Sequence, residues 1–391
     1  MPNASGRRFR GGAADAHSEL LANIRQHMAE NLARLPNYTC RETIERTSAA
    51  RGSKHFALVD RLRLEVAYVG GREMYAWPGE DRFQDRSIVE IVGKGAAIGA
   101  GNFAMHARAV FTTNAPVFTW AGEEEREGRN VVRFDFTVAR DKSRYAIQTV
   151  GAPEIVAYSG FVEADAGTLD PLRLAVQAAD LPPDLLLAGA GEIMEYGRLR
   201  IGDSNFLLPQ SSELTMTGIN GVEDRNQTRF EACREFAGES TVRFDVDETA
   251  TAGGTAAAPI ALPAGLLMEA ILREPIDQAD YARGDVVHAV VSRDVKKAGK
   301  VIVPKGAVIT GRVTHVFTDT FRSLVYFGVG MRFHAIEFGG RRGDFAGQVE
   351  VAGIGSDYSA GVDKATGDSM VYVKTKTERL AAGTRLMLRT K

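Results

Sequence analysis

A Pro-x-Gly turn followed at once by an apolar run occurs twice in the last third of the chain, and a degenerate third copy closes it. The copies read LPAGLLMEAIL from Leu262, VPKGAVITGRV from Val303 and LAAGTRLMLRT from Leu380. Proline fixes φ at the second position of a turn, and glycine is favoured at its end. Each copy is therefore predicted to start a strand after a tight reversal, which indicates an architecture and not a chemistry.

Length and charge narrow the class of protein. A chain of 391 residues is too long for one compact core and predicts two domains. Its 48 basic and 50 acidic side chains nearly balance, so no strong field favours nucleic acid or an anionic membrane surface. No apolar run approaches the roughly 18 residues that a membrane helix needs. We therefore expect no nucleic-acid partner and no transmembrane segment.

The first twelve residues, MPNASGRRFRGG, are basic and glycine-rich and are predicted to be disordered. They lack the apolar segment of a secretory signal. Two interpretations stay open: a cytoplasmic start, or a processed or misassigned start with a signal upstream of the sequence given.

Residues 13–246 are predicted to form a curved antiparallel sheet preceded by a helix. Pro36 ends the helix, whose apolar stripe consists of Leu20, Leu21, Ile24, Met28, Leu32 and Leu35. Beyond it, apolar residues alternate with charged ones, as expected of strands with one buried face. The clearest runs are Leu62, Leu64, Val66 and Tyr68, then Val132, Phe134, Phe136 and Val138, then Val242, Phe244 and Val246.

The glycine- and alanine-rich segment from Gly93 to Phe111 interrupts these strands. Its second half is compatible with a helix, and its first half has too much backbone freedom for a regular element. The spacing of Gly93, Gly95, Gly99 and Gly101 is one residue off a dinucleotide-binding fingerprint, and its surroundings are antiparallel. A flexible loop over the sheet is the favoured interpretation.

Composition changes abruptly at residues 247–259, DETATAGGTAAAP, which we interpret as a linker. Residues 260–391 are almost wholly β by pattern and are predicted to form a small barrel-like domain. Within them, residues 339–344 resemble a hairpin tip and residues 353–368 a long exposed loop. The predicted class is α+β, mainly antiparallel β: a curved half-barrel sheet with helices, followed by a small all-β barrel-like domain.

The only two cysteines, Cys40 and Cys233, lie near the two ends of the predicted first domain. A bond between them would close a loop of about 190 residues and contribute about 4 to 5 kcal/mol on the chain-entropy model. The alternative is two unrelated buried thiols. A bond would place the protein in an oxidising compartment.

Five aromatic side chains of the first sheet are candidates for the lining of a lipid-sized cavity. They are Tyr68, Tyr75, Trp77, Phe134 and Phe136. Ordinary core packing is the competing interpretation for each of them.

Motifs for catalysis or metal binding are weak. The seven histidines are scattered without an i, i+4 pair, and no Gly-x-Ser-x-Gly elbow occurs. Carboxylates such as Asp165, Asp170 and Asp363 stand where turns need aspartate for local hydrogen bonds. The sequence therefore predicts no cofactor, no metal and no enzymatic activity.

The second domain resembles the β-barrel domain of conjugation and type IV secretion channel proteins, through LPAGLLMEAIL, GDVVHAVVSRDV and IVPKGAVITGRV. The first resembles the half-barrel of periplasmic lipoprotein carriers, through the helix ending at Leu35, RLRLEVAYV and SGFVEADAGTLDPLRL. With NYTCRETIER and CREF, the chain also resembles a family of bacterial envelope proteins. These resemblances imply a periplasmic or envelope location, with a cytoplasmic one as the alternative.

Two functional hypotheses follow. In the first, a non-enzymatic envelope protein holds an apolar or lipid-like ligand in its first domain and docks an envelope partner through its second. In the alternative, the protein is a structural or assembly component of a secretion-like envelope complex without a ligand.

Overall fold

The computed structural model describes residues 9–80, 83, 88–92, 105–149, 152–236, 260–321, 324–353, 355–374 and 377–391, with side chains for all of these except 9–14, 89, 320 and 321. They divide into two compact units. The first lies within Met1–Val59, Leu64–Ala76 and Arg82–Ala237, and the second within Asp60–Arg63, Trp77–Asp81 and Gly238–Lys391. The predicted linker 247–259, the strand at Val242 to Val246 and the glycines from Gly93 to Gly101 lie outside the described residues.

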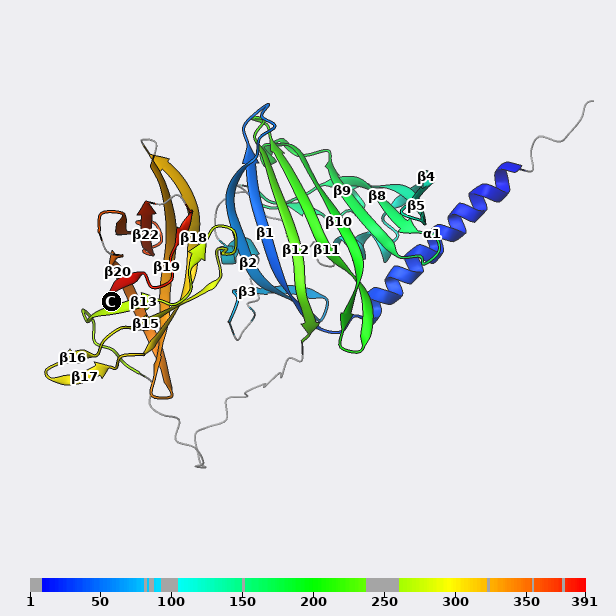
Figure 1. The fold of residues 1–391 in the computed structure, drawn as a ribbon. Coiled ribbons are helices and arrows are strands. Elements are labelled where there is room, and N and C mark those ends of the chain that lie inside the picture. The colour runs from blue at the N-terminus through cyan, green and yellow to red at the C-terminus, as the bar shows by residue number, and fades with distance from the viewer. Residues whose placement is uncertain are drawn as a thin grey trace, which may run out of the picture. The chain divides into compact units, whose positions relative to one another are not determined.

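The first unit is a curved ten-stranded sheet with strand order β3-β2-β1-β12-β11-β10-β9-β8-β5-β4 (Figure 1). Its long strands are β1 (Tyr38–Ala49), β2 (Ala57–Val69), β4 (Val117–Arg126), β5 (Arg129–Val138), β8 (Ala157–Asp165), β9 (Pro171–Ala179), β10 (Leu187–Ile201), β11 (Ser204–Gly218) and β12 (Glu223–Glu235). The shorter elements are β3 (Arg72–Ala76), β6 (Ala146–Ile147), β7 (Glu154–Ile155), η1 (Arg140–Lys142) and η2 (Pro183–Leu185).

Alternation of side chains explains why these segments form strands. Along β5, Val132, Phe134, Phe136 and Val138 are each at most 2% exposed, whereas the intervening residues face outward. Tight turns join the strands at residues 127–128, 166–168 and 202–203. The predicted fold class, α+β with mainly antiparallel strands, is confirmed.

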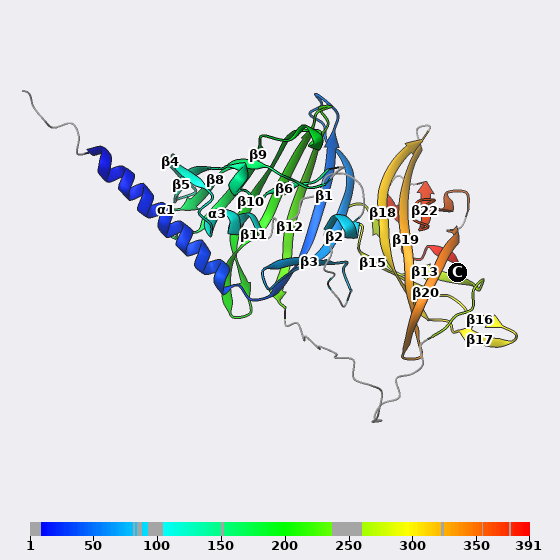
Figure 2. The same ribbon diagram turned by 180° about the vertical axis from the view of Figure 1, so that it is seen from behind.

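Helix α1 (Phe9–Arg34) covers the inward face of this sheet with the predicted stripe, since Ile24, Met28 and Leu32 are at most 5% exposed. It begins at Phe9, within the stretch predicted to be disordered; residues 1–8 lie outside the described residues. Asn31 joins the helix to β11, because its amide donates to the Leu207 carbonyl at 2.8 Å and accepts from the Leu207 N–H at 2.9 Å. Two short helices, α2 (Ile88–Val92) and α3 (Met105–Phe111), lie on the same unit (Figure 2).

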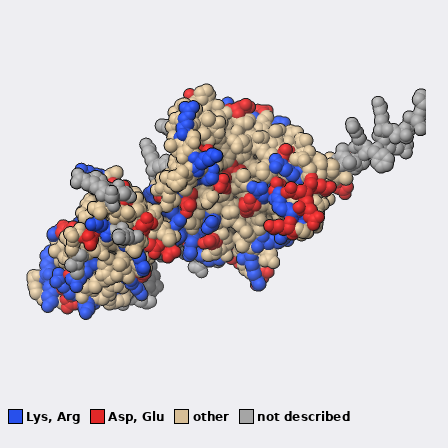
Figure 3. All heavy atoms as spheres, turned by 45° about the horizontal axis from the view of Figure 1, so that its top comes forward, with Lys and Arg blue, Asp and Glu red and all other residues tan. Residues whose placement is uncertain are grey.

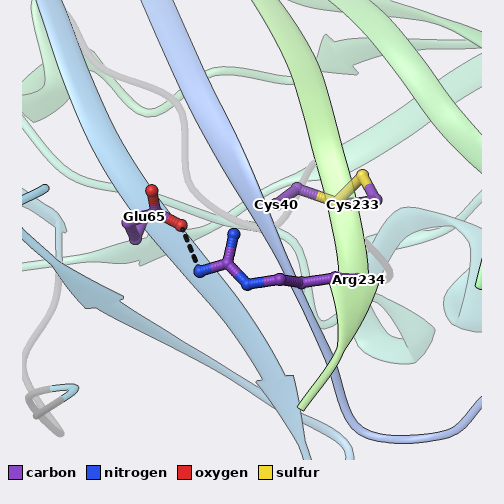
Figure 4. The surroundings of a disulfide bond; sticks show 4 residues. All are labelled: Cys40, Glu65, Cys233 and Arg234. Atoms are coloured by element: carbon purple, nitrogen blue, oxygen red, sulfur yellow. Dashed lines mark ion pairs between the residues drawn. A yellow bond between two sulfur atoms is a disulfide. The ribbon is translucent and has the colours of Figure 1, made fainter. Parts of the chain in front are cut away.

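Strands β1 and β12, the first and the last strand of this sheet along the chain, pair antiparallel and are joined by a disulfide between Cys40 and Cys233 (Figure 4). The register shifts at this point, and Ala232 takes a φ of 50°, which marks a β-bulge. Arg234 reaches past β1 to Glu65 of β2, with its Nη2 3.5 Å from Oε2. The disulfide therefore links two neighbouring strands whose cysteines are 193 residues apart in the chain.

The second unit contains a closed antiparallel barrel of six strands in the order β18-β15-β13-β24-β20-β19, because β19 also pairs with β18. These strands are β13 (Leu267–Leu272), β15 (Val286–Val291), β18 (Val308–Phe321), β19 (Leu324–Phe338), β20 (Arg341–Ala352) and β24 (Arg385–Thr390). Strands β21 (Tyr358–Val362) and β22 (Ser369–Lys374) continue the sheet from β19. Two ribbons complete the unit: β14 (Ile276–Asp277) with β23 (Arg379–Leu380), and β16 (Val295–Lys297) with β17 (Lys300–Val303).

The three repeated turns share one geometry, and each is followed two residues later by a strand, as predicted. Their glycines take φ values of 76°, 88° and 83°, a region that glycine enters without steric cost. Two backbone hydrogen bonds hold each turn to a neighbouring strand. The glycine N–H donates to the carbonyl of the last residue of that strand. The N–H of the same strand residue donates to the carbonyl of the residue that follows the glycine. The pairs are Gly265 with Thr390, Gly306 with Val291 and Gly383 with Leu272.

One predicted loop contains a strand. Residues 353–368 were expected to be irregular and exposed, but Tyr358–Val362 forms β21 and pairs with β22. The reversal between the two strands depends on Asp363, whose Oδ1 accepts the N–H groups of Ala365 and Thr366. The strand was not predicted because β21 is short and because glycines within and around it are typical of a loop.

Candidate functional site

The candidate cavity residues Phe134 and Phe136 lie on β5 in the apolar half of the inward face. Their rings contact other rings: Trp120 is 5.2 Å from Phe134, and Phe118 and Tyr158 are 5.6 and 6.1 Å from Phe136, measured between centroids. Side chains of α1 and α3 pack in the same cluster. Both residues therefore have ordinary core neighbours, and their role in lining a cavity stays a prediction.

The other three candidates lie elsewhere. Tyr68 on β2 and Tyr75 on β3 are 4% and 5% exposed. Arg108 donates through Nε to the Tyr68 hydroxyl at 2.6 Å, and the Tyr75 hydroxyl donates to Glu73 Oε2 at 2.8 Å. Trp77 is half-buried and belongs to the second compact unit. The structure thus separates the five residues into a packed pair, a polar pair and Trp77.

The inward face becomes polar across β10, β11, β12 and β1. The strand register places Glu192, Leu214, Asn226 and Arg46 in one row across these four strands. Six polar residues of these strands are at most 5% exposed: Glu42, Arg46, Glu192, Ser212, Asn226 and Thr228. Burial of so many polar groups on one side of a sheet is costly unless each finds a partner.

Two carboxylates of this half lack partners for one oxygen each. Glu42 Oε2 and Glu192 Oε1 are buried without a hydrogen bond among the described residues. The other Glu192 oxygen, Oε2, lies 3.5 Å from His106 Nε2 of α3. Burial, followed by the repulsion of the Glu73 and Glu192 carboxylates, raises the pKa of Glu42 to about 8. At neutral pH, Glu42 is therefore mostly an uncharged acid, able to donate or to accept a hydrogen bond.

Tyrosines surround these carboxylates. Desolvation is the main reason why the pKa values of Tyr38, Tyr75, Tyr145 and Tyr196 are raised, and nearby glutamates add to the effect. All four remain neutral phenols at any physiological pH. The Tyr196 hydroxyl has no hydrogen-bond partner among the described residues. We name the set of Glu42, Glu192, His106, Tyr75 and Tyr196 the polar cluster.

The polar cluster can accept a group rich in hydrogen-bond donors. Its unpartnered oxygens, on Glu42, Glu192 and Tyr196, can each accept a hydrogen bond, and a desolvated carboxylate such as that of Glu192 gains most from a charged donor such as an ammonium. Across the described residues, no three His, Cys, Asp or Glu side chains converge in a way that would hold a metal ion.

Sequence reasoning missed this cluster. Glu42 and Arg46 lie two residues before and two residues after Ile44 on β1 and share its buried face, but a pattern based on polarity assigns charged residues to the outward side. His106 and Arg108 belong to α3, in the second half of the segment from Gly93 to Phe111, which was predicted to be compatible with a helix. Asp165 accepts the N–H groups of its own turn, as predicted.

Asp170 differs from the predicted turn aspartate, because it binds side chains from two other elements. Its carboxylate takes two hydrogen bonds of 2.7 Å from Arg198 of β10 and lies 2.8 Å from His27 Nε2 of α1. Desolvation raises the pKa of Asp170, but the bonds from Arg198 and His27 outweigh it and lower the pKa overall. This triad fastens α1 to the sheet.

A groove of about 520 Å³ in the second unit lies where β20 and β22 diverge from β19. Two charged residues of its lining are paired with each other, since Arg332 Nε donates to the buried Asp368 Oδ1 at 2.6 Å. The groove therefore offers fewer unpartnered buried polar atoms to a ligand than the polar cluster does.

Within the described part of the chain, no helix is both long and apolar enough to span a membrane. No protein-family model matches the sequence, and no curated protein matches it either.

Two solved structures are similar to the chain. A DUF1329 family protein from Desulfovibrio piger has a TM-score of 0.32 and 10% identity, with 57% of this chain and 94% of that chain covered. A domain described as an outer membrane lipoprotein-sorting protein from Vibrio parahaemolyticus has a TM-score of 0.29 and 12% identity, with 54% of this chain and 92% of that chain covered. At these TM-scores, neither likeness carries a conclusion about this chain.

Proposed function

We propose that the protein is a non-enzymatic binding protein of the cell envelope whose first unit holds an amphipathic ligand on the inward face of its sheet. The ligand's donor-bearing head contacts the polar cluster, and its apolar part lies toward the apolar half of the face. The observation that carries this proposal is the pair of buried glutamates, Glu42 and Glu192, each 3% exposed and each with an oxygen that lacks a partner among the described residues.

The oxidising location rests on the disulfide. Bonds of this kind persist in the periplasm and other oxidising compartments and are rare in the cytosol. Both cysteines of the chain are used by it, so no thiol is left as a nucleophile. This supports a binding role over thiol-based catalysis.

Isothermal titration of the full chain with decylamine, decanol and decanoate tests the head-group chemistry, since the three probes share one alkyl chain. We expect decylamine to bind more tightly than decanoate, and Glu192→Gln to weaken decylamine binding by about tenfold to a hundredfold, the range for a hydrogen bond to a charged group. Glu125→Gln, an exposed carboxylate of β4, is the control. Equal affinities for the three probes, or none at all, would remove the proposal.

A role as a structural component of an envelope complex without a ligand is the second candidate. It is favoured by the filling of the apolar half, where Phe134 and Phe136 pack against protein side chains. The closed barrel of the second unit then supplies a docking module. Crosslinking in cells that returns only monomer would count against this candidate, and a native mass spectrum with a co-purifying amphiphile would favour the first.

A further inference from the structure

The β16–β17 hairpin of the second unit is a short ribbon anchored at its base. Val295 and Val303, which pair across it, are 7% and 0% exposed and belong to the barrel core. Asp294 Oδ1 accepts the Lys305 N–H at 2.9 Å and fixes the same end. At the tip, Ala298 and Gly299 take φ values of 49° and 79°, as a two-residue type I′ turn requires.

The hairpin carries an unusual concentration of positive charge. Residues 293–305 hold five basic side chains and one acidic one, a net charge of +4 in a chain whose net charge is −2. Lys296, Lys297 and Lys300 are exposed, and none of them forms an ion pair with another described residue. Figure 3 shows basic side chains gathered at the end of this unit where Figure 1 places β16 and β17.

The register places like charges directly opposite each other. Lys297 pairs with Lys300 across the turn, and Lys296 pairs with Val301. Like charges that face each other across a strand pair destabilise it. The ribbon therefore carries an electrostatic cost in isolation that an anionic surface would relieve.

An exposed apolar side chain stands beside these lysines. Val301 is 48% exposed on the face that it shares with Lys296, and its neighbour Ile302 is half-buried. A thin ribbon with lysines at its tip and an exposed valine beside them has the composition of a segment that enters the interface of a bilayer.

We propose that the β16–β17 hairpin binds the surface of an anionic phospholipid bilayer, with its lysines at the headgroup phosphates and Val301 at the boundary of the acyl region. The proposal does not depend on any ligand of the first unit. Nucleic acid fits less well, since the ribbon has no aromatic residue on which a base could stack. An acidic protein segment would leave the exposed valine without a role.

Co-sedimentation of the full chain with vesicles tests this, using phosphatidylcholine alone and phosphatidylcholine with 30% phosphatidylglycerol. The anionic vesicles are expected to bind the protein at low ionic strength and to release it as salt is raised. The triple variant K296Q/K297Q/K300Q should lower the partition coefficient about a hundredfold, because each lysine near such a surface contributes about a factor of five. V301S should lower it a few-fold.

The matched control is K364Q/K374Q/R379Q, which removes three exposed charges of the same unit outside the hairpin. It should retain binding within a few-fold of the wild-type protein. The hairpin variant should also melt no lower than wild type, because it removes the facing lysine pair.

Equal binding to both vesicle types would overturn the proposal. So would full retention of binding by the hairpin variant, which would assign membrane binding to another part of the chain. Binding to soluble polyglutamate without binding to vesicles would replace the membrane by an acidic protein.

Discussion

Glu42→Gln tests the central electrostatic claim about the polar cluster. The substitution keeps the size and one carbonyl oxygen of the side chain and removes its proton equilibrium. The pKa of Glu42 is raised from 4.5 to about 8 in the folded protein, chiefly by burial. The folded state therefore binds a proton that the unfolded chain releases at much lower pH.

The magnitude follows from proton linkage. Below pH 4.5 both states hold the proton, and this group costs no stability. As pH rises from 4.5 toward 8, only the unfolded state loses it, and the free energy of unfolding falls by roughly 1.4 kcal/mol per pH unit. At pH 7 this amounts to about 3 kcal/mol relative to pH 4.5. The glutamine variant lacks this loss, so its stability relative to wild type should rise by about that amount between pH 4.5 and pH 7.

Urea unfolding of both proteins at several pH values from 5 to 8 measures the effect as a difference in slope. Comparing slopes cancels the contribution of the other titrating groups and any constant cost of the amide. Glu125→Gln, on an exposed carboxylate, should change the slope little. If wild type and Glu42→Gln run parallel over this range, the carboxyl is not desolvated as the structure has it.

Three further predictions concern the frame around the site. Replacing Cys40 and Cys233 by serine opens a loop of 193 residues and should cost about 3 to 5 kcal/mol in denaturant unfolding; a loss below about 1 kcal/mol would contradict the constraint. Asp170→Asn should cost about 1 to 3 kcal/mol at pH 7 by weakening the bonds from Arg198, and should reduce the stability that wild type loses as pH falls through the lowered pKa of Asp170; an unchanged acid limb would refute this. Gly306→Ala should lower stability by about 1 kcal/mol in thermal melts, because its φ of 88° disfavours a Cβ; no change would argue against the turn geometry.

Much of the fold could be predicted because its signals are local. The Pro-x-Gly turns depend on one glycine in the left-handed region, and the stripe of α1 depends on a spacing that any helix repeats. The strand β5 shows its buried face through strict alternation from Val132 to Val138. Closure of the six-stranded barrel could not be predicted in the same way, since it depends on which distant strands pair.

The candidate site was less predictable, for a physical reason. Aromatic residues such as Phe134 were reasonable candidates for the lining of a cavity. The sequence pattern of an aromatic residue is the same, however, whether its ring lines a cavity or packs in a core. The buried charges of Glu42 and Glu192 break the rule that charged residues face outward, so a pattern based on polarity assigns them to the wrong side. Only the register across β10, β11, β12 and β1 reveals that they share a face.

The two units have one consequence of topology in common. In the first unit, β1 pairs with β12, and in the second, β13 pairs with β24. One edge of the first strand of each unit therefore stays unpaired until the last strand has been synthesised. A nascent chain would carry these open edges through most of its synthesis, a condition that slows folding and invites aggregation. Late completion of both sheets therefore leaves each unit unfinished until its last strand has been synthesised.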